Sequence, residues 1–340
     1  MALVVTMDEM QARLVRYGEL KPCTTAFIDT RTPGSDKKEN FTIIGPGVAE
    51  NPDQHVHISI PHGFNIGAAR QPPRCINSQH SHETAEVFVI HSGYWRFKTG
   101  HDASGPFIDL HPGDTISIPV HIFRGFENIG DAQGFMFAVL GGDDPGRVTW
   151  APYVFEAAAQ HGLVLLESGQ LIDTQRQAVP PGAAIMPPTT MDDVARMRSV
   201  TVEELEACVV RASDLTPAGY LSAWAGFAEA PIVGVANPSE SMPAGRMGWS
   251  HHFQLRALSV QPGAVSPWHS RLEEEVLLVH TGHVVMAWPN GQLPLGPGDT
   301  LTVPKGLMRR YSNVGTDPAR VYVVRGGDHP ASAVTQAAVA

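Results

Sequence analysis

Short runs rich in β-branched and aromatic residues, each ended by glycine or proline, follow one another along most of the chain. One run, residues 86–100 (EVFVIHSGYWRFKTG), breaks at Ser92-Gly93, which predicts a hairpin turn. Another, from Phe107 to Leu110, leads through Pro-Gly-Asp into TISIP, and a polar turn then leads into FENIG. Many short strands separated by tight turns predict an all-β fold of the barrel or jelly-roll type.

Two segments have a helical pattern instead. Residues 7–17 have apolar spacing that fits a helix, with Thr6 as a suitable N-cap, and a similar segment begins at Thr201. Residues 153–173 mix helical and strand spacing, so we expect a short helix followed by an extended piece.

The pattern occurs twice. Residues 64–93 align without a gap with residues 253–282, and HPGDTISIPVHIFRGFENIG in the first half aligns with GPGDTLTVPKGLMRRYSNVG in the second. The helical segments at Thr6 and Thr201 extend the duplication over nearly the whole chain. We therefore expect a first domain at 1–176, a semi-rigid linker rich in proline and alanine at 177–190, and a second domain at 191–340.

Composition narrows the classes of function. A hydrophobic fraction of 43% is typical of globular chains, and a net charge of -10 argues against a nucleic acid or an anionic membrane as the main partner. Three separated cysteines indicate free thiols in a reducing compartment, and the start of the chain lacks the pattern of a signal peptide. We expect a cytoplasmic protein, a small-molecule substrate and a homo-oligomer.

Three side chains in the first half carry candidate metal chemistry. His80 and His82 are two residues apart on a predicted strand, so they share a face, and Glu86 has the same parity. Two imidazoles and one carboxylate suit Fe(II) and leave coordination positions open. Another divalent transition metal, such as Mn, Ni, Cu or Zn, fits the same donors, and a polar barrel lining without metal is the alternative.

The spacing of these residues also resembles the sequence motif of a known family. His80-x-His82-x3-Glu86-x6-Gly93 resembles the first motif of the cupin superfamily, and Gly113-x5-Pro119 resembles the second. Because both recur in register, the resemblance implies a bicupin: two tandem jelly-roll barrels with short helical lead-ins.

The second cupin motif usually supplies a fourth ligand, a histidine, where this chain has Arg124, which does not ligate metal. His121, three residues earlier, is an alternative fourth ligand. We expect a three-ligand site with Arg124 beside it. There the guanidinium either holds a substrate carboxylate or forms a structural ion pair with Glu86 or Glu83.

Other side chains are weaker candidates. The aromatic residues Phe88, Trp95 and Phe97 are expected as apolar walls of a substrate site. The histidines His55, His57 and His62 are candidates for support around the metal site. His91 and His280 occupy the same turn in both halves, which favours a structural role.

In the second half the four ligand positions hold His269, Arg271, Glu275 and Arg309. Two fixed cations at these positions disfavour a divalent ion, so we expect a degenerate site in which the arginines neutralise Glu275. An anion-binding pocket aided by Arg310 is the alternative.

Bicupins of this size resemble gentisate-type ring-cleaving dioxygenases. That resemblance implies an Fe(II) dioxygenase acting on a small hydroxyaromatic or carboxylate-bearing substrate. A non-redox, metal-dependent isomerase or decarboxylase of a small acid is the second hypothesis, and a metal-free binding or regulatory protein is the third.

Overall fold

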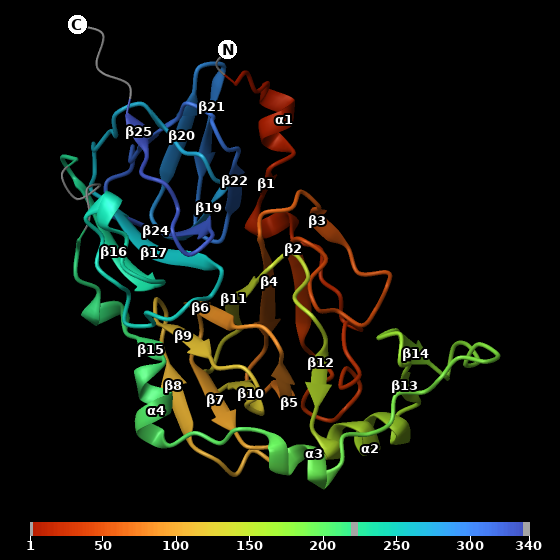
Figure 1. Cartoon of the computed structure of the whole chain (residues 1–340). Coiled ribbons are helices and arrows are strands. Elements are labelled where there is room, and N and C mark those ends of the chain that lie inside the picture. The colour runs from red at the N-terminus through yellow and green to blue at the C-terminus, as the bar shows by residue number, and fades with distance from the viewer. Residues whose placement is uncertain (1–2, 219–223, 336–340) are drawn as a thin grey trace, which may run out of the picture. The chain divides into compact units, whose positions relative to one another are not determined.

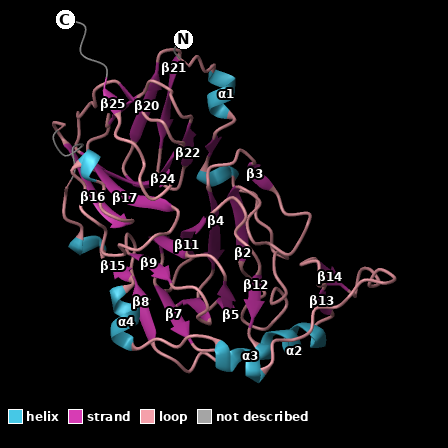
Figure 2. Ribbon diagram, viewed as in Figure 1, coloured by secondary structure: helices cyan, strands magenta, loops and turns pink. Residues whose placement is uncertain are grey.

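The computed structural model describes residues 3–218 and 224–335, in which strands dominate and helices are few and short (Figure 2). The chain forms two compact units. One is Lys21–Val209, here called the first barrel; the other combines Met1–Leu20 with Val210–Ala340 and is called the second barrel. The all-β class and the two tandem barrels predicted from the sequence are therefore confirmed.

The first barrel is built from two large sheets. One has the strand order β15-β9-β6-β11-β4-β2-β3 and the other the order β12-β5-β10-β7-β8. The strands are β2 (Glu39–Ile44), β3 (Val56–Ile58), β4 (Phe64–Gln71), β5 (Ile76–His82), β6 (Glu86–Ser92), β7 (Trp95–Thr99), β8 (Phe107–Leu110), β9 (Thr115–Ile118), β10 (Arg124–Asn128), β11 (Gly134–Gly141), β12 (Val148–Trp150) and β15 (Val209–Val210).

The predicted hairpin at Ser92-Gly93 is wrong in one respect. The chain turns there, but β6 and β7 lie in different sheets and do not pair. Gly93 has φ 83°, and a Cβ on it would lie 2.6 Å from the Cα of Gly134. Only glycine fits this close approach, and the turn carries the chain from one sheet to the other instead of folding it back.

A repeated asparagine closes the turn after β10 and its counterpart. Asn128 Nδ2 donates to the carbonyls of Gln71 and Ala132, both at 2.8 Å. In the second barrel Asn313 donates in the same way to Val260 and Asp317, at 2.9 and 2.8 Å. The part of the motif shared by both halves is thus structural.

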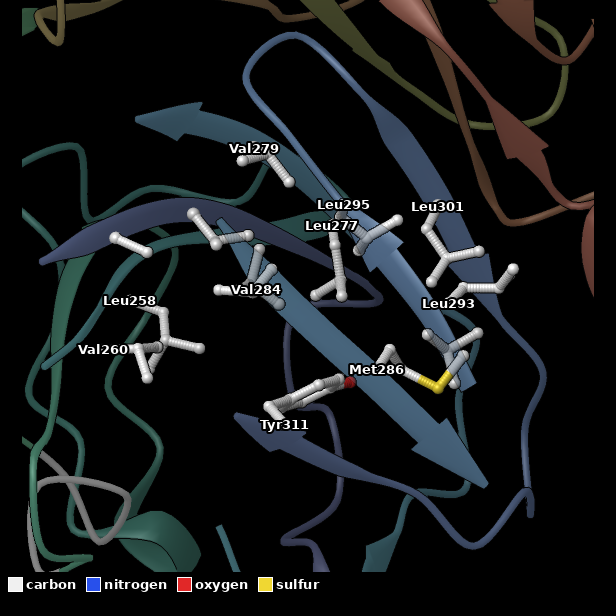
Figure 3. Close-up of a cluster of buried hydrophobic side chains, with 14 of the residues drawn as sticks. Leu258, Val260, Leu277, Val279, Val284, Met286, Leu293, Leu295, Leu301 and Tyr311 are labelled. Carbon is white, nitrogen blue, oxygen red and sulfur yellow. The ribbon is translucent and has the colours of Figure 1, made fainter. Parts of the chain in front are cut away.

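The second barrel repeats the layout with the sheets β1-β22-β19-β24-β17-β16, β21-β20-β23 and β18-β25. Its strands are β16 (Phe227–Val233), β17 (Phe253–Val260), β18 (His269–Ser270), β19 (Glu275–Thr281), β20 (Val284–Trp288), β21 (Gly291–Leu295), β22 (Thr300–Val303), β23 (Arg310–Ser312), β24 (Ala319–Gly326) and β25 (Val334–Thr335). Aliphatic side chains such as Leu277, Val284 and Leu301 fill its core (Figure 3).

The first twenty residues belong to the second barrel (Figure 1). The helix α1 (Met7–Gln11) has the predicted N-cap, with a capping box in which the Thr6 side chain accepts from the Glu9 N–H. It is shorter than expected, because the chain then forms β1 (Leu14–Val15), which pairs with β22. Met10 is fully buried in the second core.

The corresponding segment of the second half packs on the first barrel. The helix α4 (Val202–Ala207) buries Leu205 in the first core, and Ser117 on β9 donates to the Cys208 carbonyl at 2.9 Å. The boundaries of the compact units thus differ from the expected 1–176 and 191–340 at both ends. The segment before the first barrel belongs to the second unit, and the segment before the second barrel belongs to the first.

Residues 150–200 complete the first barrel. They form α2 (Pro152–Gln160), β13 (Leu163–Leu165), β14 (Leu171–Asp173) and α3 (Met191–Arg196), which confirms the expected helix and extended piece. The segment 177–190 lies inside the first unit, where Met186 donates to the Leu165 carbonyl. The described chain also contains the short 3₁₀ turns η1 (Tyr17–Glu19), η2 (Ala212–Asp214) and η4 (Pro238–Glu240). No described helix has the length and apolar character needed to cross a membrane.

Candidate metal centre

His80, His82 and Glu86 converge on one point in the wall of the first barrel. The two histidines lie at the end of β5, and Glu86 begins β6 after a short turn. One ligand atom from each of the three lies within 4.8 Å of the others, and all three residues are buried. The alternation of side chains along a strand therefore gives the shared face that the sequence predicts.

His80 is held in one orientation by its own strand. Its Nδ1 lies 2.7 Å from the Ser78 carbonyl, which selects the tautomer with hydrogen on Nδ1 and leaves Nε2 with a free lone pair. The ring of Trp150 lies beside it, with centroids 5.2 Å apart. Burial, with a smaller contribution from the Arg124 charge, lowers the pKa of His80 to about 3, so the imidazole stays neutral and able to ligate.

A buried ion pair, which the sequence analysis missed, supports the backbone before His80. Asp29 and Lys38 form a salt bridge with both side chains fully buried. Asp29 accepts from the Ser78 N–H at 3.0 Å, and Lys38 donates to Asn77 at 2.9 Å. Burial raises the pKa of Asp29, but Lys38 more than offsets this and holds it below its usual range. The pair thus fixes the stretch of β5 that orients His80.

His82 is fully buried, and its Nδ1 has no hydrogen-bond partner among the described residues. Its Nε2 lies 3.6 Å from the nearer oxygen of Glu86. Burial, followed by the charge of Arg124, lowers the pKa of His82 well below its usual value. A neutral, buried ring whose Nδ1 has no partner and whose Nε2 faces Glu86 has a lone pair to offer a metal ion, so the residues present fit a divalent metal.

Arg124 lies next to the ligands, where it forms an ion pair with one of them, Glu86. It faces His80 across the β5–β10 pair and donates to Glu86 at 2.5 Å and to the His80 carbonyl at 3.4 Å. Burial raises the pKa of Glu86, and the guanidinium opposes that rise. Of the two roles considered for Arg124, the geometry shows the ion pair with Glu86, and Arg124 is not among the residues that line the adjoining cavity.

A cavity opens from the ligands into the first barrel. Including its opening to solvent, it has a volume of about 640 Å³. Its walls are mostly apolar, with a few polar side chains from β2, β5 and the loop before β3. The residues used below are Asn40, Thr42, Gln54, Gly67, Ala69, Phe88, Phe126, Ala138, Leu140, Val148 and Trp150.

Of the three aromatic residues predicted as walls, only Phe88 lines this cavity. Trp95 and Phe97 are fully buried in the core behind it. Phe126 and Trp150 line the cavity and were missed, because Phe126 is not a ligand position of the second motif and Trp150 lies outside both motifs. Phe126 follows Arg124 by two residues, so strand parity alone could have identified it.

His121 does not join the cluster. Its side chain is exposed, its backbone has φ 60°, and among the described residues the group that could hold metal contains only the three ligands named above. The turn directs the ring outward, so the hypothesis of a fourth histidine ligand gains no support from the geometry.

The remaining histidines make structural contacts. His57 binds the Thr42 carbonyl through Nδ1 and accepts from the Lys21 N–H through Nε2, while His55 is exposed and packs against His57. His62 binds the Ile60 carbonyl at 2.6 Å. The repeated pair packs edge-on against aromatic rings, His91 on Phe135 and Phe137, and His280 on Tyr322.

In the second barrel, arginines surround the carboxylate at the ligand position. Glu275 accepts from Arg271 at 3.2 Å, Arg309 at 3.0 Å and Arg325 at 2.6 Å, and from the Tyr311 hydroxyl at 2.5 Å. Burial raises the pKa of Glu275, but the three guanidinium groups hold it well below its usual value. The expected neutralisation by Arg271 and Arg309 is observed, whereas Arg325 was missed because it lies outside both motifs.

The network extends deeper into the second barrel. Arg325 and Arg256 both bind Glu229, and Arg256 and Arg271 both bind Glu240. These side chains are at most 2% exposed. Burial lowers the pKa of His269 to about 3, and its Nδ1 lies 3.0 Å from the Pro267 carbonyl. The ligand position is thus occupied by a closed ionic network.

Arg310 does not take part in this network. Its side chain is exposed, and its guanidinium lies over the Trp268 ring at 4.8 Å. It follows Arg309 directly on the strand, so it points to the opposite face. The geometry at Glu275 therefore gives no support to an anion pocket aided by Arg310.

Comparisons with known proteins agree with this fold. Residues 257–325 match the family model described as a cupin domain. The oxalate decarboxylase of Lactobacillus farciminis, solved with formate, is 14% identical, covers 95% of this chain and 88% of its own length, and has a TM-score of 0.56. A tryptophan-to-phenylalanine variant of the Bacillus subtilis oxalate decarboxylase is 14% identical, with coverages of 98% and 80% and a TM-score of 0.58. No curated protein matches the sequence.

The chain therefore has the fold of a bicupin, with two similar β-barrels in one polypeptide, and residues 257–325 of the second barrel match the cupin-domain model. At this level of identity the likeness to the decarboxylases shows the fold alone. The narrower resemblance to gentisate-type dioxygenases is not confirmed by these comparisons.

Proposed function

We propose that this bicupin is a metal-dependent enzyme that transforms a small carboxylic acid without oxidation, as a decarboxylase or an isomerase. The observation that carries the proposal is the convergence of His80, His82 and Glu86 on one point in the wall of a cavity. Structurally similar bicupins include oxalate decarboxylases, and one of these is described for its Mn(II) centres, which supports both the acid and a divalent ion.

The charges of the site favour an anionic substrate. The two imidazoles are neutral, and Arg124 balances Glu86, so the protein contributes no net charge. A divalent ion held there would leave two positive charges in a buried site, and uncompensated buried charge is costly. A substrate carboxylate reduces that cost.

The chain's own residues then have separable tasks. His80, His82 and Glu86 would hold the ion, which supplies Lewis-acid polarisation of a carboxylate or carbonyl oxygen. Arg124 opposes the rise in the pKa of Glu86 that burial causes, and its hydrogen bond fixes the orientation of that carboxylate. Phe88, with other apolar walls, keeps bulk water away from the bound acid.

An Fe(II) dioxygenase is the second candidate. Two histidines and one carboxylate leave three positions of an octahedral ion for substrate and oxygen, and this set is known for non-haem iron oxygenases. Both candidates hold a divalent ion with the same three residues, so the use of oxygen as a co-substrate is what separates them.

The test uses protein purified without a histidine tag, loaded in turn with Mn(II) and Fe(II), and exposed to a panel of small carboxylic acids. We expect turnover, seen as released carbon dioxide or an isomeric product, without oxygen uptake, and none in the His82→Ala variant. Stoichiometric oxygen consumption would establish the dioxygenase instead. A protein that retains no metal would support the metal-free binding protein.

A further inference from the structure

Strand register arranges the cavity wall in rows, because directly paired residues on neighbouring strands face the same side of a sheet. Glu86 pairs with Leu140 on β11. Two residues further along β11, Ala138 pairs with Gly67 on β4. On the other side Ala138 pairs with Phe88 on β6, so beyond Phe88 this row presents very little side-chain volume, and this leaves room for the cavity.

The second barrel shows what the same positions hold when no cavity is kept. In the internal alignment Arg256 stands at the position of Gly67, and Arg325 at that of Leu140. Both guanidinium groups point into the barrel and bind Glu229, at 3.3 and 2.8 Å. Two long cationic side chains thus occupy the volume that is open in the first barrel.

The counterpart of Glu229 in the first barrel is Asn40. Glu229 pairs with Leu258 and Asn40 with Ala69, and these two partners align in the repeat. Asn40 lines the cavity and is 8% exposed, and its Nδ2 is buried without a hydrogen-bond partner among the described residues. The amide donor is therefore available to a ligand in the cavity that offers an acceptor, and leaving such a buried donor unpaired costs about 1–3 kcal/mol.

A second buried polar atom in the cavity wall also has no hydrogen-bond partner among the described residues. Gln54 lines the cavity and donates to the Thr42 hydroxyl, but its Oε1 is buried without a partner among the described residues. β2, which carries Asn40, is separated from β6 by β11 and β4. At a strand spacing of about 4.8 Å, the two strands lie roughly 14 Å apart along the curved sheet.

We propose that Asn40 is a specificity-determining residue that binds the far end of the substrate. The geometry points to a monocarboxylic acid whose carboxylate lies at the metal ligands, whose apolar body lies along Phe88 and Leu140, and whose distal oxygen accepts a hydrogen bond from Asn40 Nδ2. A two-carbon diacid such as oxalate leaves Asn40 unsatisfied. This inference rests on the proposed function, because it takes the carboxylate to bind at the metal.

The test compares two rigid acids that differ only at the distal group. para-Acetylbenzoate carries a carbonyl oxygen where para-isopropylbenzoate carries a methyl group, and oxalate serves as the short acid. Binding to Mn(II)-loaded protein is measured by calorimetry. We expect the acetyl compound to bind about 5- to 10-fold more tightly than the isopropyl compound, the range of one neutral hydrogen bond. Both should bind more tightly than oxalate.

Asn40→Leu, which keeps the branched shape and removes the amide, should abolish the preference. It should also raise the melting temperature of the ligand-free protein, because it removes an unsatisfied buried donor. A purely structural asparagine would show the opposite, a loss of stability with the preference unchanged. Asn290→Leu, the same substitution at an exposed turn of the second barrel, is the control and should keep the preference. If Asn40→Leu fails to fold, Asn40→Asp serves, since a carboxylate repels the acetyl oxygen.

Equal affinities for the two benzoates, or a preference that survives in Asn40→Leu, would overturn the inference and leave the proposed function standing. Metal-dependent binding of oxalate, with no binding of either benzoate, would also overturn the inference and leave the proposed function standing. If no acid binds the metal-loaded protein more tightly than it binds His82→Ala, the proposed function fails together with the inference.

Discussion

At the scale of single residues, the first barrel differs from the second mainly in what balances its central carboxylate. Glu86 has one cationic partner, Arg124, whereas Glu275 has three. A buried carboxylate that loses its partner is strongly destabilising, while one that keeps other partners is less affected. The equivalent positions Arg124 and Arg309 therefore offer a matched pair of substitutions.

Arg124→Met should lower the free energy of unfolding of metal-free protein by about 3–5 kcal/mol, because Glu86 is left buried without its ion pair. Divalent metal should restore much of this loss, since the ion supplies the missing positive charge. Arg309→Met should cost less and should not respond to metal. Urea denaturation with and without Mn(II) measures both. A metal response of the same size in both variants would contradict this assignment of Arg124.

Glu50 provides a prediction about pH. It is buried and accepts from Trp150 Nε1 at 2.6 Å and the Ile28 N–H at 2.7 Å, and burial raises its pKa to about 8 despite the Trp150 hydrogen bond. Between the ordinary value and about 8, the folded protein holds a proton that the unfolded chain has lost. Stability should therefore fall as pH rises through this window.

Glu50→Gln removes this dependence. The stability of the variant relative to wild type should increase from about pH 5 to about pH 9, by at most about 1.4 kcal/mol per pH unit. Thermal or urea unfolding across the pH range measures it. A constant difference between variant and wild type would show that Glu50 is ionised when folded.

At the scale of elements, the lead-in segments are exchanged between the units. α1 and β1 complete the second barrel, and α4 completes the first. Each lead-in buries an apolar side chain at an equivalent position of the repeat, Met10 in the second core and Leu205 in the first. The stability of each barrel should thus depend on a segment encoded in the other half.

Met10→Ala should loosen the second barrel and leave metal retention unchanged. Leu205→Ala should loosen the first barrel and weaken metal retention. Each truncation of a fully buried side chain costs about 2–5 kcal/mol. Limited proteolysis with mass spectrometry locates the loosened unit, and elemental analysis gives the metal content. If Met10→Ala exposed cleavage sites within residues 21–209 instead, the assignment of α1 to the second barrel would be wrong.

At the scale of the whole molecule, one barrel keeps a cavity with ligands and the other is filled by an ionic network. Among the described residues, the only cluster that could hold a metal lies in the first barrel. The family model nevertheless matches residues 257–325 in the second barrel. The match therefore reports the fold of the repeat, and its chemistry has to be judged from the side chains.

Metal should bind at one equivalent per chain. His82→Ala should lose it without unfolding, and His121→Ala, whose side chain is exposed, should retain it. Elemental analysis of protein purified without a histidine tag gives the stoichiometry, and circular dichroism checks the fold. Two equivalents per chain would mean that His269 and Glu275 recruit ligands despite the surrounding arginines.

The sequence by itself determined the features that depend on local periodicity and on the repeat. Alternation along a strand placed His80 and His82 on one face, and the aligned halves showed two β-barrels of which only one keeps the ligand set. Thr6 could be recognised as an N-cap because capping needs only the next few residues.

Tertiary structure alone decided features that depend on which strands become neighbours. The turn at Gly93 gave no sign that β6 and β7 enter different sheets. The similar sequences of the two helical lead-ins gave no sign that each belongs to the barrel formed by the other half of the chain. The sequence allowed Arg124 to be either a substrate clamp or an ion-pair partner, and its ion pair with Glu86 became visible only in the tertiary structure. The unsatisfied amide of Asn40 likewise follows from contacts between residues far apart in sequence, which no local pattern encodes.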